Sequence, residues 1–226
     1  ILAASANSKH VVIVGGRLLG LELADALTLL QNHVTILQRS DRLMGKQLDI
    51  QAATLLAEEI RDRNIAIHFN TSLIGVIGTN KVESIRILPT HSPEQSLPCD
   101  MLIFATGIIP NKELAGAAGL DCERGILINH HLQTSDENIF AIGECAQLND
   151  QTFGTTPDAE EQAAALAQFL RGNLHAPYRG TTTANILKVH GLQLASAGQV
   201  EEIPHPPVDV LLPPDPTPLP NTEVLI

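Results

Sequence analysis

The sequence has few cysteines and no long apolar run. Its three cysteines, Cys99, Cys122 and Cys145, are widely separated and form no CxxC pair. This spacing excludes a dithiol redox pair, and it excludes an iron–sulfur cluster held by cysteines of this chain alone. We expect three packed thiols in a cytoplasmic protein. No apolar stretch approaches the ~20 residues that cross a bilayer, so we expect no membrane partner.

Basic residues and metal-ligand spacings are also scarce. The 14 Lys and Arg residues against 25 Asp and Glu residues give a net charge of −11, which argues against a nucleic-acid partner. The nine histidines show no ligand spacing. His130 and His131 are adjacent on an expected strand, where their rings would point to opposite faces. We therefore expect no metal site. Residues 1–10 lack the pattern of a signal peptide and are interpreted as the end of a linker.

The first hundred residues follow an α/β pattern. A chain of 226 residues, 44% of them apolar, is long enough for one large or two modest domains. A buried strand at His10–Val14, a glycine turn, a helix and a strand at Val34–Leu37 predict a right-handed βαβ unit. An amphipathic helix beginning near Asp49 and a third strand at Ile65–Phe69 follow.

An antiparallel pair interrupts this α/β pattern. We expect it at Ser72–Ile77 and Val82–Leu88, on either side of a turn. Residues Pro89–Pro98 are expected to form a polar loop, and Met101–Ala105 another buried strand.

A second unit is predicted downstream. It contains a short helix, a strand at Ile126–Asn129, a strand at Asn138–Ile142 and a long helix. Thr156 is the expected N-cap of that helix, with Pro157 at its first position. From Gly180 we expect strands, followed by a proline-rich, extended tail.

The turn after the first strand resembles a dinucleotide fingerprint with one substitution. Such a fingerprint has glycines in the tight turn, at the pyrophosphate and at the helix–strand contact. Gly15 and Gly20 fill the first and third places, but Arg17 occupies the second. The stem of Arg17 would crowd the pyrophosphate, whereas its guanidinium could pair with phosphate oxygens. Both weakened binding and a re-routed functional site remain open.

The position that distinguishes the two nicotinamide nucleotides is also atypical. An acid about twenty residues after the fingerprint usually binds the ribose 2′-hydroxyl. Here Gln38 stands in that place, followed by Arg39 and Arg42. The two arginines favour a 2′-phosphate, hence NADPH, but two solvated arginines explain them equally well. Glu22 is expected in the first helical turn, where the helix dipole favours an acid.

A second candidate site follows the expected strand at Asn138–Ile142. This strand would deliver Gly143 and Glu144 to its carboxyl end, where open α/β folds bind ligands. The glycine admits close approach of a ligand, and the acid can accept hydrogen bonds from a polyol. A strand-to-turn junction with a solvated glutamate is the alternative.

Five segments in order carry a family resemblance. VVIVGGRLLGLELA, LMGKQLD, IFATGIIPN, TSDENIFAIGECA and EEQA together resemble the flavin-dependent pyridine nucleotide oxidoreductases with two dinucleotide-binding domains. The resemblance covers about residues 8–200. LMGKQLD, the GEC ending and ILKVHGLQLASAG are similar to the flavoprotein region of the large subunit of NAD(P)H-dependent assimilatory nitrite reductases.

The resemblance implies NAD(P)H and FAD as cofactors, with these site residues. The nicotinamide nucleotide would lie against Gly15, Gly16, Arg17, Leu19 and Gly20, with Glu22 near the nicotinamide and Gln38 and Arg39 at the ribose. Ala105, Thr106 and Gly107 would form the crossover between domains. FAD would lie against Gly143 and Glu144, and Glu161 and Gln162 would begin a helix whose positive end faces the flavin. No catalytic side chain is expected, because hydride transfer to a flavin depends on positioning.

The resemblance also implies the domain plan and the partners. We expect an α/β fold in which a Rossmann-like NAD(P)H-binding domain, residues 8–110, is inserted in an FAD-binding domain. Residues 111–178 would form the second half of that domain, and residues 179–226 the start of a C-terminal domain. The first FAD-binding half is expected from outside this sequence. The electron acceptor would carry iron–sulfur and sirohaem groups, and a homodimer stays open.

Three functional interpretations remain. The first is an FAD-dependent NAD(P)H oxidoreductase that passes electrons to a nitrite reductase centre. The second has another acceptor, as in rubredoxin or ferredoxin reductases. The third is a degenerate nucleotide-binding module without catalysis, motivated by Arg17, Gln38 and Glu160; the last replaces an aromatic residue of the family. We expect this chain alone to bind dinucleotides weakly at most and not to turn over.

Overall fold

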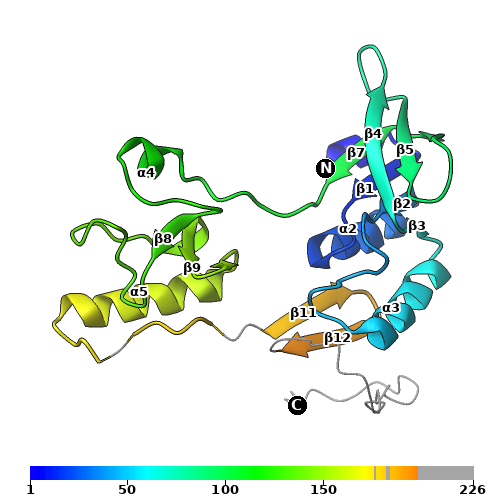
Figure 1. Cartoon of the computed structure of the whole chain (residues 1–226). Helices are drawn as coiled ribbons and strands as arrows, with labels where there is room; N and C mark the ends of the chain where they lie inside the picture. Colours follow the sequence, from blue (N-terminus) through cyan, green and yellow to red (C-terminus); the bar gives the residue numbers. More distant parts are fainter. Residues whose placement is uncertain (176, 182–183, 198–226) are drawn as a thin grey trace.

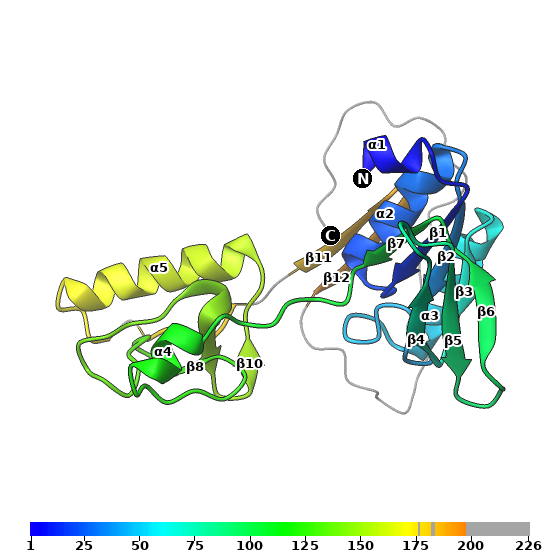
Figure 2. The same cartoon turned by 90° about the horizontal axis from the view of Figure 1, so that it is seen from above.

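The computed structural model describes residues 1–175, 177–181 and 184–197. These residues form two units that lie side by side and are joined by two linkers (Figures 1 and 2). One linker follows β7 and the other precedes β11. A short helix, α1 (Leu2–Ser5), precedes the first unit. No helix in the described ranges is long and apolar enough to cross a membrane.

A four-stranded parallel sheet is the centre of the first unit. Its order is β3-β2-β1-β7, from β1 (His10–Val14), β2 (His33–Leu37), β3 (Ala66–His68) and β7 (Met101–Phe104). Its central strand β1 has the sequence HVVIV, an apolar run typical of a parallel strand that is buried on both faces. The predicted βαβ unit and its strands are therefore confirmed.

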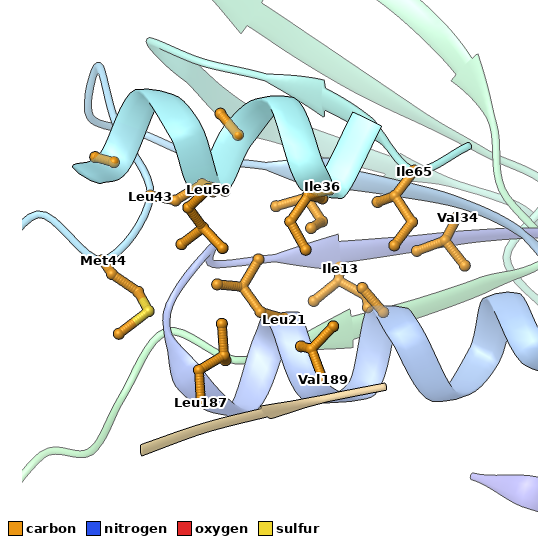
Figure 3. Close-up of a cluster of buried hydrophobic side chains, with 14 of the residues drawn as sticks. Ile13, Leu21, Val34, Ile36, Leu43, Met44, Leu56, Ile65, Leu187 and Val189 are labelled. Atoms are coloured by element: carbon orange, nitrogen blue, oxygen red, sulfur yellow. The ribbon is translucent and has the colours of Figure 1, made fainter. Parts of the chain in front are cut away.

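Two helices contribute to the core on one face of this sheet. They are α2 (Leu18–Leu29) and α3 (Ile50–Asp62), and α3 begins near Asp49, as predicted. Asp49 is its N-cap, and its side chain accepts a hydrogen bond from the Ala52 N–H at 2.8 Å. Ile13 and Ile36 of the sheet pack with Leu21 of α2 in one buried cluster (Figure 3). Alternate residues of β1, such as Val12, point to the opposite face.

A three-stranded antiparallel sheet covers that opposite face. It has the order β4-β5-β6, from β4 (Thr71–Ile77), β5 (Ser84–Pro89) and β6 (Gln95–Pro98). The predicted hairpin is confirmed, but the polar loop predicted over Pro89–Pro98 is wrong in its second half. The strand β6 pairs with β5 at the sheet edge. An edge strand is held by main-chain hydrogen bonds and needs no apolar pattern, so its polar sequence gave no sign of it.

A hairpin from the end of the described chain packs on the first unit. It consists of β11 (Ala184–Val189) and β12 (Leu192–Ala197), which confirms strands after Gly180. Leu187 and Val189 are 1% and 5% exposed and extend the core beside α2 (Figure 3). The expected extended tail lies outside the described residues.

The second unit is a small sheet packed on one helix. Its strands are β8 (Ile126–Ile128), β9 (Ala146–Leu148) and β10 (Gln151–Thr152), in the order β10-β9-β8. The helices are α4 (Glu113–Ala117), the 3₁₀ turn η1 (Gly143–Cys145) and α5 (Thr156–Leu170). Leu132 and Phe153 are buried in its core.

Three local predictions for this unit are wrong. Asn138–Ile142 forms no strand, because only Phe140 makes a bridge, to Gln133, and no neighbouring strand completes a ladder. His130 and His131 lie in a turn after β8 rather than on a strand. The N-cap of α5 is Thr155 and not Thr156, because the Thr155 side chain and Asp158 cap each other reciprocally.

Candidate functional site

A cavity lies at the carboxyl ends of the parallel strands. Its volume is about 580 Å³, within the range of small-molecule sites. The lining residues come from the segments after β1, β2 and β7 and from the start of β4: Val14, Gly15, Arg17, Leu37, Gln38, Arg39, Ser40, Thr71, Ser72, Leu73, Phe104, Ala105 and Thr106. Six of them are predicted site residues: Gly15, Arg17, Gln38, Arg39, Ala105 and Thr106. The fold thus brings three distant segments of the prediction to one place.

The charge of this cavity is opposite to that of the whole chain. Arg17 and Arg39 both line it and both are exposed, and its lining contains no aspartate or glutamate. The chain as a whole carries a net charge of −11. A concave surface of one sign attracts ligands of the opposite sign. The cavity therefore favours an anionic ligand.

Gly15 and Gly20 allow the glycine turn to pack closely against β7 and α2 beside the cavity. Gly15 has a φ of +114°, and a Cβ there would lie 2.4 Å from the carbonyl oxygen of Ala105. A Cβ on Gly20 would lie 2.0 Å from the carbonyl oxygen of Gly15. Any larger side chain at either position would push α2 or β7 away from the turn. This is the close helix–strand packing that the fingerprint requires.

Arg17 fits its position without backbone strain. It is the N-cap of α2, with φ −104° and ψ −177°, an extended conformation that any residue adopts. Its guanidinium lies close to Gly107, where a Cβ would be 3.9 Å from Nη1. No hydrogen bond or ion pair joins Arg17 to another residue in the described part of the chain. Its charge is therefore available to a ligand.

Gln38 connects the glycine turn to the loop after β2. Its Oε1 accepts a hydrogen bond from the Gly16 N–H at 2.8 Å. Its Nε2 donates to Ser40 Oγ at 2.5 Å and to the Arg42 carbonyl at 3.1 Å. Gly16 itself does not line the cavity, but it is linked to the site through Gln38.

Glu22 and Leu19 lie outside this cavity. Glu22 is the fifth residue of α2, so its predicted place in the first turn is wrong, because the helix begins only at Leu18. Its carboxylate accepts a hydrogen bond from the Lys188 N–H of β11 at 3.0 Å. Leu19 is 76% exposed. Glu22 therefore links α2 to the β11–β12 hairpin.

The predicted flavin residues gather in the second unit. Gly143 has a φ of +78°, and its N–H donates to Gln162 Oε1 at 2.6 Å. Glu144 and Glu161 are both exposed. The prediction that Glu161 and Gln162 begin a helix is wrong. They lie in the second turn of α5, because the Thr155 cap starts this helix earlier.

Gln162 carries a polar group without a partner. Its side chain is fully buried, and its Nε2 has no hydrogen bond to any described residue. A buried donor left unpaired costs about 1–3 kcal/mol, so such groups usually mark a missing partner. The neighbourhood of Gly143 is thus incomplete in the residues described.

The structure does not bring the two predicted groups together. The cavity belongs to the first unit, whereas Gly143 and Gln162 belong to the second, which lies apart from the first in the part of the chain that the structure describes (Figure 2). Hydride transfer requires reacting atoms about 3–3.5 Å apart. The two predicted groups of residues therefore lie in separate units.

Sequence reasoning missed the residues that β4 contributes to the cavity. Thr71, Ser72 and Leu73 line it, although they follow β3 in a hairpin with no motif of its own. The polar pair Thr71-Ser72 directly after a parallel strand is the one sign that could have indicated them. Phe104, at the end of β7, is 62% exposed at the cavity and was predicted only as part of a buried strand.

The cysteines and histidines form no further site in the described ranges. No group of three or more His, Cys, Asp or Glu residues there could hold a metal ion. Cys99 is fully buried, and this burial raises the pKa of its thiol. All three cysteines are free. Cys99 is thus a packed thiol, as expected.

Comparison with known proteins gives the family of this chain. A family model described as pyridine nucleotide-disulphide oxidoreductase matches residues 1–163. The chain is 35% identical over 194 residues to the assimilatory nitrate reductase electron transfer subunit of Bacillus subtilis, covering 86% of this chain and 25% of that protein. It is 34% identical over 201 residues to the nitrite reductase [NAD(P)H] of the same organism, covering 89% and 24%.

A solved structure supports the fold. The structure of a ferredoxin reductase from Rhodopseudomonas palustris superimposes with a TM-score of 0.78 at 26% identity, covering 87% of this chain and 49% of that one. The chain spans about a quarter of the length of the two Bacillus relatives. The predicted α/β fold and the predicted family are both confirmed. The chain belongs to the pyridine nucleotide-disulphide oxidoreductase family.

Proposed function

We propose that this chain is the NAD(P)H-binding part of an FAD-dependent oxidoreductase and that its cavity holds the nucleotide. The observation that carries this proposal is the cavity lined by Arg17 and Arg39 with no carboxylate, in a chain of net charge −11. A dinucleotide is an anion of this size class, and it binds at the carboxyl ends of parallel strands.

The start of α2 supplies hydrogen-bond donors for the phosphates. The N–H groups of Leu18, Leu19 and Gly20 have no acceptor within the helix, because the first turn of any α-helix lacks them. Arg17, the N-cap, caps none of them with its side chain. These donors and the positive end of the helix suit a pyrophosphate. The Arg17 guanidinium at the same helix end adds a full positive charge.

The second unit would hold part of the flavin. Gly143, with its positive φ, permits a close backbone approach, and the unpaired Nε2 of Gln162 offers a buried donor beside it. The remaining FAD contacts would come from residues outside this sequence. A flavin held there would supply hydride acceptance and electron transfer in one- or two-electron steps. The two units would have to approach one another for this transfer.

The proposed acceptor is a nitrite reductase centre with iron–sulfur and sirohaem groups. The two Bacillus relatives are named as a nitrite reductase and as a nitrate reductase electron transfer subunit, which supports this class of acceptor. The three free cysteines support a reducing compartment such as the cytoplasm.

A ferredoxin-type acceptor is the second candidate. The likeness to the Rhodopseudomonas ferredoxin reductase favours it. The full-length protein distinguishes the two acceptors: NAD(P)H oxidation coupled to nitrite supports the first, and NAD(P)H oxidation that needs an added ferredoxin supports the second. If the full-length protein carries flavin but reduces neither acceptor, both assignments are wrong.

The proposal is tested by calorimetric titration of this chain with NADH, NADPH and FAD. We expect Arg17→Ala to weaken nicotinamide nucleotide binding about 5- to 10-fold, because an exposed charge-assisted contact contributes roughly 1 kcal/mol. Arg171→Ala, an exposed arginine at the end of α5, is the matched control and should change nothing.

Two results would contradict this assignment of the site. If the folded chain binds neither NADH nor NADPH, the cavity is not a nucleotide site. That result would favour the third interpretation, a degenerate nucleotide-binding module without catalysis. If Arg17→Ala binds more tightly, Arg17 obstructs the pyrophosphate instead of pairing with it.

A further inference from the structure

The sequence that follows the described chain carries charges of one sign only. We call residues 198–226, which come directly after β12, the acidic segment. It contains neither lysine nor arginine, and its five carboxylates are Glu201, Glu202, Asp209, Asp215 and Glu223. Eight of the 14 prolines of the chain also lie in it. The acidic segment therefore has the sign of charge that a cationic cavity attracts.

The cavity of the first unit has the complementary charge. Arg17 and Arg39 line it and are exposed, and its lining contains no aspartate or glutamate. Within the described ranges neither guanidinium has a hydrogen bond or an ion pair with another residue. A free guanidinium binds a carboxylate through two parallel hydrogen bonds, as it binds a phosphate. The cavity can therefore accept the carboxylates of a peptide.

The same cavity also exposes apolar side chains. Phe104 is 62% exposed there, and Leu37 and Leu73 contribute to the lining. Proline-rich peptides bind surfaces that expose aromatic rings, because such peptides lose little conformational freedom on binding. Between Asp209 and Asp215 the acidic segment has the sequence VLLPP, so apolar residues stand between two carboxylates. The segment thus matches both the charge and the apolar lining of the cavity.

The acidic segment begins close to the glycine turn. Ser196 Oγ, one residue before the end of β12, donates a hydrogen bond to the Gln47 carbonyl at 2.6 Å. The Gln47 N–H donates to the Met44 carbonyl at 2.7 Å, and the Met44 N–H donates to the Gly16 carbonyl at 3.0 Å. Met44 also packs in one buried cluster with Leu187 of the hairpin (Figure 3). A short series of contacts therefore connects the end of β12 to the edge of the cavity.

This proximity gives the acidic segment a high local concentration at the cavity. A proline-rich chain spans about 3.1 Å per residue, so ten residues reach roughly 30 Å. A domain of about 100 residues has a radius of gyration of only about 13 Å, so the whole cavity is within reach. A ligand tethered over such a length has an effective concentration of about 1 mM. Even a few weak ion pairs then keep the segment bound for much of the time.

We propose that the acidic segment binds in the cavity, with its carboxylates on Arg17 and Arg39, and competes there with anionic ligands. The occupant is a segment of this chain rather than a second protein, because the tether and the charge pattern belong to the same chain. The inference goes beyond the proposed function by giving the cavity an internal competitor. Only the competition with a nucleotide rests on the proposed function, because docking of the segment needs no nucleotide.

Neutralising the acidic segment in the full chain tests the competition. The variant replaces its five carboxylates by amides of the same shape: Glu201→Gln, Glu202→Gln, Asp209→Asn, Asp215→Asn and Glu223→Gln. In calorimetry at about 50 mM NaCl, NADH and NADPH should bind this variant about threefold or more tightly than the wild type, because a cavity occupied part of the time lowers the apparent affinity. At about 0.5 M NaCl the difference should largely disappear, because salt screens exposed ion pairs.

A second variant controls for the change in net charge. It removes five exposed carboxylates from the described chain instead: Glu58→Gln, Asp62→Asn, Asp121→Asn, Glu137→Gln and Asp150→Asn. Its affinity for both nucleotides should stay within about 1.5-fold of that of the wild type, because these groups lie outside the cavity. If the two variants tighten binding equally, general charge repulsion explains the effect and the inference is overturned.

A synthetic peptide of residues 198–226 tests the docking without any nucleotide. It should bind the neutralised chain saturably, and Arg39→Ala in that chain should weaken this binding about threefold or more, whereas Arg171→Ala should not. In the wild-type chain the peptide should compete with NADH and NADPH, which decides the question if the neutralised chain fails to fold. Absence of peptide binding, or equal binding by the Arg39→Ala variant, would overturn the inference. Peptide binding without nucleotide binding would support the inference and contradict the proposed function.

Discussion

Replacing Gly20 by alanine should destabilise the first unit, although alanine is the better helix former. A Cβ on Gly20 would lie 2.0 Å from the Gly15 carbonyl oxygen, more than 1 Å inside a normal contact. The Cβ is attached directly to the helix backbone and the oxygen is a backbone atom, so neither can rotate away and α2 must move away from the turn. Overpacking of this kind costs about 1–3 kcal/mol and occasionally more. The helix propensity of alanine returns about 1 kcal/mol. A 2.0 Å contact belongs at the upper end of the overpacking range, so we expect a net loss of about 2 kcal/mol in the free energy of unfolding.

Urea denaturation followed by circular dichroism measures this loss. With a slope of about 2 kcal/mol per molar urea, the midpoint should fall by about 1 M. Gly116→Ala is the matched control, because Gly116 lies inside α4 and a Cβ there would meet nothing within 4 Å. It should be neutral or stabilising by up to about 1 kcal/mol. If Gly20→Ala is as stable as Gly116→Ala, the close contact between α2 and the turn is not a constraint, and this reasoning fails.

Two further predictions concern the hairpin and the base of the sheet. Leu187→Ala should lower the free energy of unfolding by about 2–3 kcal/mol, because Leu187 is 1% exposed. Ile186→Ala on the same strand is the control: Ile186 is 61% exposed, so the loss should be less than about 0.5 kcal/mol. Equal losses in urea denaturation would contradict the packing of β11 on the first unit. Asp100 accepts hydrogen bonds from the His10 and Lys9 N–H groups, which lower the pKa of its carboxyl. A lowered pKa stabilises the folded state above the unfolded pKa of about 3.9 and loses that effect as the pH falls through the folded value. The stability difference between wild type and Asp100→Asn should therefore shrink from pH 7 to pH 3, and a difference independent of pH would refute this account.

The sequence predicted the elements that have a strong local pattern. The apolar run of β1, the glycine turn and the amphipathic α3 each depend on neighbouring residues only. Where the pattern was weak or the partners were distant, prediction failed. The strand β6 is polar and exists because β5 offers it an edge. Asn138–Ile142 has an apolar strand pattern but forms no strand, since no neighbour pairs with it.

The candidate site divides in the same way. The sequence alone placed Gly15, Arg17 and Gln38 at the carboxyl ends of strands, because motif spacing along a βαβ unit fixes those positions. It left open whether the stem of Arg17 crowds a pyrophosphate or its guanidinium pairs with the phosphate oxygens. The extended φ of −104° at Arg17 shows that no glycine is required there.

Tertiary structure alone decided the contacts between residues far apart in the chain. The sequence determined the fold class, the family and the acidic composition, because these follow from periodicity, motif order and residue counts. It could not assign Glu22 to the backbone of β11, some 166 residues away, or show that a chain of net charge −11 has a cavity lined by two arginines and no acid. Such features arise only when folding brings distant segments to one surface, and no local pattern encodes which charges meet there.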